Sequence, residues 1–197
     1  MAHDAISDEQ ILHRGEVILT AVIQSQLMEC VGSEVTLIEQ SITREEREGE
    51  EDEEENKVLK EIGLLVRRTA QKLQQDTELN HAIDSKWPLT SKDSFWKLVN
   101  EVFEDGVISW ERIVVLFYIA GKLAVKVVNA HIPHRVSEII SWTLDFFRGN
   151  LVDWIREQGG WENIISCLST PTSQMVAIFL SGILLGAFIV WRMTKNN

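Results

Sequence analysis

The chain has 197 residues, of which 45% are hydrophobic, and its formal net charge is −11. This composition excludes a disordered or fibrous chain and is sufficient for a domain with a substantial core. Residues 43–56 contain nine acidic and two basic residues and carry −7 of the −11, which leaves only −4 for the rest of the chain. Because no basic stripe or patch is present, nucleic acid is not an expected partner.

The first predicted helix begins at the capping box Ser7–Gln10 and runs to about Leu27, with apolar residues at helical spacing. We expect residues 1–42 to contain this helix and its flank. Residues 43–57 are predicted to form a disordered acidic loop, because like charges at this density repel one another and bury nothing.

A second amphipathic helix is predicted from about Val58 to Ile83, and the following Trp87-Pro88 ends it, because a residue before proline avoids the α conformation. A short helix capped by Thr90 or Ser91 comes next. It ends near Gly106, which can adopt a positive φ. Its apolar residues are Phe95, Trp96, Leu98, Val99, Val102 and Phe103.

Ser109 is predicted to cap a helix that has no polar face between Ile113 and Gly121. Such a helix belongs in the centre of a bundle or in lipid, and this uncharged stretch is too short to span a bilayer. After a turn at His131–His134, a second apolar helix is predicted from Val136 to about Phe147. The expected fold class is an all-α globular bundle with a central hydrophobic helical hairpin.

Two shorter segments, Asn150–Gln158 and Trp161–Leu168, are expected to be hinged at Gly159-Gly160. They complete a helical core of residues 58–169, with which the helix of residues 7–27 packs as one domain.

Residues 174–192 are predicted to form a C-terminal membrane anchor, because Met175–Trp191 contains no charge and, with the uncharged Thr, Ser and Gln residues before it, can form a helix about 25–30 Å long. Trp191 and the cations after it suit the membrane interface. Gly182 and Gly186 have the spacing of a helix-packing motif, which is short enough to arise by chance. The segment could also shelter in a groove of the bundle, and the two arrangements are treated as states of one protein.

Two motifs stand in order along the chain: Phe103–Gly106 followed by Ser109–Tyr118, and then Trp154–Trp161. They resemble the first and second homology motifs of the Bcl-2 family. Trp142–Phe146, Thr170–Thr172 and the apolar tail resemble the Bax-like, pro-apoptotic branch. The resemblance extends over residues 7–27 and 58–191.

This resemblance implies a groove that binds an amphipathic helix, a mode of recognition for which this family is a standard example. Trp110 and Arg112 are expected at its edge, and its predicted floor consists of Val99, Phe103, Ile113, Leu116 and Phe117. Plain core packing is the competing interpretation for each aromatic residue, and it is preferred for the second-motif residues Trp154 and Trp161, and for Trp142. Gly159 and Gly160 complete the second motif.

The predicted death-motif helix departs from the family pattern. A gapless alignment places the apolar anchors at Ile62, Val66, Thr69 and Leu73, the small residue at Ala70, and Gln71 where relatives have aspartate. A second register, one heptad earlier, fits Leu59–Gly63 better, but it needs an insertion and puts Leu64 at the acidic position. In both registers the carboxylate is missing, so a charge-assisted bond to the groove arginine is lost.

The resemblance implies a pro-apoptotic effector that oligomerises and permeabilises the mitochondrial outer membrane after activation by death-motif helices. Its expected partners are Bcl-2 family proteins, death-motif helices, other copies of itself and outer-membrane lipid. The expected location is the cytosol and the mitochondrial outer membrane. The alternative is a survival-type protein that sequesters death-motif helices in its groove without forming pores.

No feature of the sequence indicates an enzyme. A phosphate-binding loop, a nucleophile elbow and metal-ligand spacing are all missing, so no cofactor or metal is expected. His131 and His134 flank a proline in a turn and are interpreted as a solvent-exposed pair. Cys30 and Cys167 are interpreted as reduced thiols.

Overall fold

The computed structural model describes residues 7–31, 53–85 and 91–168, and these ranges contain helices and turns without a strand. The all-α fold class is therefore confirmed for the described part of the chain, whereas the predicted anchor at residues 174–192 lies outside it. No described helix is sufficiently long and apolar to cross a membrane. In chain order the helices are α1 (Asp8–Val31), α3 (Glu53–Leu73), α4 (Thr77–Ser85), α5 (Lys92–Val102), α6 (Trp110–Asn129), α7 (Arg135–Asn150), α8 (Val152–Glu157) and α9 (Asn163–Leu168).

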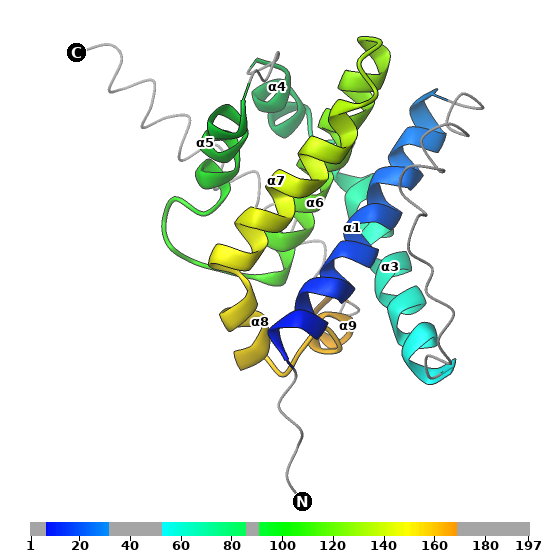
Figure 1. Cartoon of the computed structure of the whole chain (residues 1–197), viewed down its shortest axis with the longest axis vertical. Helices are drawn as coiled ribbons and strands as arrows, with labels where there is room; N and C mark the ends of the chain where they lie inside the picture. The colour runs from blue at the N-terminus through cyan, green and yellow to red at the C-terminus, as the bar shows by residue number, and fades with distance from the viewer. Residues whose placement is uncertain (1–6, 32–52, 86–90, 169–197) are drawn as a thin grey trace, which may run out of the picture.

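Helix α6 forms the centre of the bundle. Every residue from Ile113 to Gly121 is buried, as the absence of a polar face predicts. Helices α1, α3, α5, α7 and α9 all pack against it. Figure 1 shows α1, α6 and α7 lying side by side, with α3 next to α1 and the short helices α8 and α9 near the start of α1.

Helix α7 is less apolar than the sequence analysis expects. Its buried residues lie on one face only, while Arg148 is exposed and Asp145 is partly exposed. The central hairpin therefore consists of one helix that is buried all round and one amphipathic helix. The buried residues of α7 are Val136, Ile139, Thr143, Phe146 and Phe147.

The predicted helix starts are confirmed by their hydrogen bonds. The Ser7 and Gln10 side chains form a reciprocal capping box, with Ser7 N–H donating to Gln10 Oε1 over 3.0 Å. Ser91 caps α5 and Ser109 caps α6, each through a side-chain oxygen that accepts a backbone N–H three residues later. Gly106, between these two helices, has the predicted positive φ of 74°.

Three helix boundaries differ from the prediction. Helix α1 continues past Leu27 to Val31. Helix α3 starts at Glu53, inside the predicted acidic loop, because glutamates are favourable in the first turn of a helix, where the partial charge is positive. The single helix expected over residues 58–83 is broken, because Asp76 Oδ1 accepts the backbone N–H groups of Glu78 and Leu79 and so starts α4.

Candidate helix-binding site

The predicted death-motif face of α3 points into the bundle. Ile62 and Val66 are fully buried, and Ala70 and Leu73 are less than 5% exposed. Thr69, the remaining predicted anchor, is half-buried and donates its hydroxyl to the carbonyl of Leu65 over 3.0 Å. Because α3 packs against α1, α6 and α9, the apolar anchors are part of the core and are not available to another molecule in this structure.

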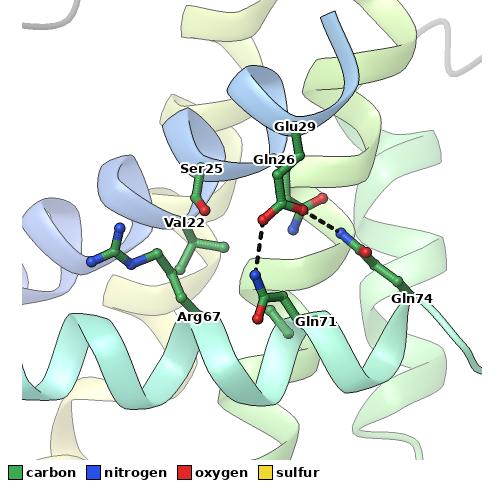
Figure 2. A pocket seen from close by; sticks show the side chains of 8 residues that line it. Val22, Ser25, Gln26, Glu29, Arg67, Gln71 and Gln74 are labelled. Carbon is green, nitrogen blue, oxygen red and sulfur yellow. Dashed lines mark hydrogen bonds between the residues drawn. The ribbon is translucent and has the colours of Figure 1, made fainter. Parts of the chain in front are cut away.

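Gln71 lies at the solvent edge of the α1–α3 interface and not near Arg112. Its Nε2 donates to Glu29 Oε1 over 2.9 Å, and Gln74 Nε2 donates to Glu29 Oε2 over 3.0 Å, as Figure 2 shows. The hydrogen bond from Gln71, which has the larger effect, and that from Gln74 hold the pKa of Glu29 below its ordinary value. Helix α3 is thus fastened to α1 by a carboxylate that accepts two amide hydrogen bonds.

A small polar hollow lies beside these bonds, between α1 and α3. Among the described residues, the buried side-chain amide of Gln26 at its edge has no hydrogen-bond partner for Nε2. A Cβ added at Gly121 of α6 would lie 2.6 Å from that nitrogen, so the glycine permits the close approach of α1 to α6. The hollow in Figure 2 is lined by Val22, Ser25, Gln26, Glu29, Arg67, Ala70, Gln71 and Gln74.

Arg112 is buried at the corner between α5 and α6, where the sequence predicts the groove edge. Its side chain is 2% exposed, and its two terminal nitrogens are occupied within the chain. Nη1 donates to Asp105 Oδ1 and, over 2.7 Å, to the carbonyl of Val107, while Nη2 donates to Asp105 Oδ2 over 2.6 Å. The guanidinium of Arg112 holds the pKa of Asp105 far below its usual range, mainly because its terminal nitrogens donate hydrogen bonds to the Asp105 carboxylate.

Trp110 lies beside Arg112 and is 3% exposed. Its ring packs edge-on against Trp154, with 5.1 Å between the ring centroids, and lies tilted against Trp161 at 5.6 Å. Within the described ranges, Trp110 Nε1 and Arg112 Nε are buried donors without a hydrogen-bond partner. The corner therefore holds two unsatisfied donors, whereas buried polar groups in folded proteins nearly always have a hydrogen-bond partner.

The residues predicted to form the groove floor are mostly inside the core. Val99, Ile113, Leu116 and Phe117 are at most 1% exposed, and only Phe103 is half-buried, against Phe146 at 5.5 Å. The structure thus brings the predicted floor residues together, but in a closed arrangement. A helix could reach them only after a rearrangement of the bundle.

The second homology motif has a structural role. Gly159 and Gly160 adopt positive φ values of 87° and 97°, which reverse the chain between α8 and α9. Trp161 is fully buried, stacks on Phe147 at 5.6 Å and donates Nε1–H to the carbonyl of Ile11 over 2.9 Å. As expected, Trp161 is a core residue, and Trp142 and Trp154 are half-buried and pack against the core.

Asn80 joins the end of α3, helix α4 and helix α6, and the sequence analysis does not single it out. Its Oδ1 accepts from the Tyr118 hydroxyl over 2.6 Å and from Lys122 Nζ. Its Nδ2 donates to the carbonyls of Gln74 and Asp76, over 3.0 and 2.6 Å. One side chain therefore holds the last turn of the predicted death-motif helix close to the central helix.

The same junction includes two ion pairs, in which Asp84 of α4 lies 3.0 Å from Lys126 Nζ and 3.4 Å from Lys122 Nζ. Burial raises the pKa of Tyr118 to about 12. A sequence signal for this junction exists in the spacing of Tyr118, Lys122 and Lys126 on one side of an otherwise apolar helix.

The model of the family described as "Apoptosis regulator proteins, Bcl-2 family" matches residues 64–161. "Apoptosis regulator BAX" of Bos taurus is 32% identical over 186 residues, which cover 94% of this chain and 91% of the relative. The chain belongs to the Bcl-2 family. Human BAX is 30% identical over 186 residues, which also cover 94% of this chain and 91% of the relative. Chicken Bcl-2-like protein 1 is 41% identical over 78 residues, which cover 40% of this chain and 34% of the relative.

Solved structures of two BOK proteins have the same Bcl-2 fold. The chicken BOK crystal structure has a TM-score of 0.61 at 21% identity and covers 82% of this chain and 98% of that chain. The human BOK solution structure has a TM-score of 0.64 at 22% identity and covers 81% and 99%. At these identities the likeness concerns the fold alone.

Proposed function

We propose that this Bcl-2 family member is a pro-apoptotic effector that permeabilises the mitochondrial outer membrane after activation by a death-motif helix. The observation that supports this best is the similarity to BAX over 94% of the chain, from before α3 to beyond the second motif. Chicken Bcl-2-like protein 1, by comparison, matches over only 40% of the chain. The predicted anchor, with Met175, Gly182, Gly186 and Trp191, is the proposed means of attachment to the membrane.

In this proposal the resting chain stores its own death-motif face inside the bundle. The buried anchors of α3 become available only when α3 separates from α1 and α6. An activating helix that binds the opened form better than the closed one shifts the population toward it. The exposed face of α3 then docks on the α5–α6 groove of a neighbouring copy, and the resulting oligomer inserts its central hairpin into the membrane.

The test is dye release from liposomes of outer-membrane lipid composition, with full-length protein and with or without an activating death-motif peptide. Glutamate at Leu73 or Leu116 is a poor probe of docking, because both side chains are buried in the resting fold and a charge there would unfold it. A tether that keeps α3 on α1 is a more specific test of the proposed opening than these substitutions. Glu29→Cys and Gln71→Cys replace two side chains that lie 2.9 Å apart.

The tethered protein is made in a background with Cys30→Ser and Cys167→Ser, because these are the only two cysteines of the chain. A cleavable thiol-to-thiol cross-linker between positions 29 and 71 should abolish release, and its cleavage should restore it. The matched control places the linker within α7, at Arg135→Cys and Glu138→Cys, which form an ion pair three residues apart. Release that continues with α3 tethered to α1 would contradict the proposed opening.

A sequestering, survival-type function is the second candidate. Gln71 in place of the usual acid favours it, because a neutral amide binds an arginine roughly half as strongly as a carboxylate does. If no condition gives dye release while activating peptides still bind tightly, the effector proposal is wrong and the sequestering function takes its place.

A further inference from the structure

The corner between α5 and α6 is acidic on its outside. Residues 101–112 contain four carboxylates and a single cation, Arg112, which gives this stretch a formal charge of −3. The Asp105 side chain is 51% exposed, whereas the Arg112 side chain is 2% exposed. A molecule arriving from solvent therefore meets the carboxylate first and not the guanidinium behind it.

Asp105 already occupies the position that a ligand carboxylate would need. It takes one hydrogen bond from each terminal nitrogen of Arg112, and Val107 takes a further one from Nη1. A ligand with an acid at this point would have to displace Asp105 or accept a close contact between like charges. Oδ1 of Asp105 also accepts the backbone N–H of Val107 over 3.0 Å, whereas Oδ2 accepts only from Arg112. An amide or an ammonium group could therefore donate to the remaining lone pair of Oδ2.

The outer edge of α3 has the complementary chemistry. From Ile62 to Gln75 the chain contains Arg67, Arg68 and Lys72 but no acidic residue. Arg68, Gln71 and Lys72 are exposed on α3, next to its buried anchors. A basic and amide-bearing helix edge of this kind matches a corner with a charge of −3, and it belongs to the same chain.

We propose that Asp105 determines specificity at this corner, and that it makes the site select α3 of a second copy over helices that carry a carboxylate at the position of Gln71. The inference depends on the proposed docking of α3 on the α5–α6 groove and adds how the partner is chosen. The amide of Gln71 donates to Asp105, while the neighbouring cations of α3 face the remaining carboxylates of residues 101–112. The missing acid in α3 is thus matched by an acid in the receiving site.

The test measures binding of a labelled peptide of residues 57–75 to full-length protein on liposomes by fluorescence anisotropy. The wild-type peptide is expected to bind at least about fivefold more tightly than the Gln71→Asp peptide at low salt, as one new like-charge contact between partly exposed groups implies. This ratio should shrink in high salt, which screens exposed charges. In the Asp105→Asn protein the order should reverse, because Arg112 keeps its charge and loses its partner.

Glu104→Gln is the matched control protein, because Glu104 is an exposed carboxylate on the same turn that has no hydrogen bond to Arg112. It should weaken both peptides alike and leave their ratio unchanged. The comparison of the two peptides on the wild-type protein needs no substitution in the receiving protein, so it decides the question even if Asp105→Asn does not fold.

Equal or tighter binding of the Gln71→Asp peptide to the wild-type protein would overturn the inference while leaving helix docking intact. If neither peptide binds any of the three proteins, α3 docking itself is refuted, and the proposed specificity of Asp105 is refuted with it.

Discussion

Replacing Asn80 by alanine is expected to lower the free energy of unfolding by about 3 kcal/mol. The change removes the acceptor of the Tyr118 hydroxyl and the donor to two backbone carbonyls at the end of α3. Each of the two lost hydrogen bonds to backbone carbonyls costs about 0.5–1 kcal/mol net, and the buried Tyr118 hydroxyl left without its acceptor costs about 1–3 kcal/mol, which together give about 3 kcal/mol. Tyr118 is 2% exposed, so water does not easily replace the lost acceptor.

For a domain of this size, 3 kcal/mol corresponds to a fall in Tm of roughly 10 °C. Thermal and urea unfolding followed by circular dichroism measure both quantities. Asn100→Ala is the matched control, because Asn100 is an exposed asparagine on α5 and its loss should change stability by less than about 0.5 kcal/mol. If Asn80→Ala costs no more than this control, the junction does not stabilise the fold.

A double-mutant cycle then identifies the partner. Tyr118→Phe removes the hydroxyl that donates to Asn80 Oδ1 and should cost about 1–2 kcal/mol alone, but much less in an Asn80→Ala background. Amide hydrogen exchange shows which helices the Asn80 junction stabilises. Amides in the last turn of α3 and in α4 should lose protection in Asn80→Ala before those of α6 do, because Asn80 joins the two outer helices to the central one.

Three further predictions follow from single contacts. Tyr118 is the only tyrosine of the chain, so tyrosinate absorbance should report a pKa of about 12. The contribution of Tyr118 to stability, measured as the difference between wild type and Tyr118→Phe, should be constant below pH ~10 and fall between pH ~10 and ~12, where only the unfolded chain ionises. The lowered pKa of Asp105 adds stability above the unfolded-state pKa of about 3.9, so the difference in stability between wild type and Asp105→Asn should shrink as the pH falls below ~4. Trp161→Ala should cost about 3–5 kcal/mol in urea unfolding, because the ring is fully buried; a cost below about 1 kcal/mol would contradict its role in the core.

Local features of the fold could be predicted because each depends on a few neighbouring residues. The apolar stretch of α6, the caps at Ser7, Ser91 and Ser109, and the positive φ of Gly106 all follow from rules about adjacent positions. The break between α3 and α4 is not predicted by periodicity, because the amphipathic pattern continues across it, although the Asp76-Thr77-Glu78 string is a helix start.

Features of the site that depend on how helices cross could not be predicted in the same way. Arg112 pairs with Asp105 seven residues earlier, and Asn80 pairs with Tyr118 at 38 residues' separation. Periodicity places a side chain on a face of its own helix but does not say which residue of another helix lies opposite. The motif predicts Arg112 at a groove edge, whereas its pairing with Asp105 is visible only in three dimensions.

The two roles of α3 compete for one surface. Ile62, Val66 and Leu73 stabilise the resting bundle, and they are also the anchors that the proposed function needs outside it. Apolar burial does not distinguish strongly between the two states, because a receiving groove can bury the same side chains over a similar area. The polar contacts differ, since the Glu29 carboxylate and the Asn80 amide hold α3 only in the resting arrangement. These contacts, more than the apolar anchors, should therefore set how readily α3 is released.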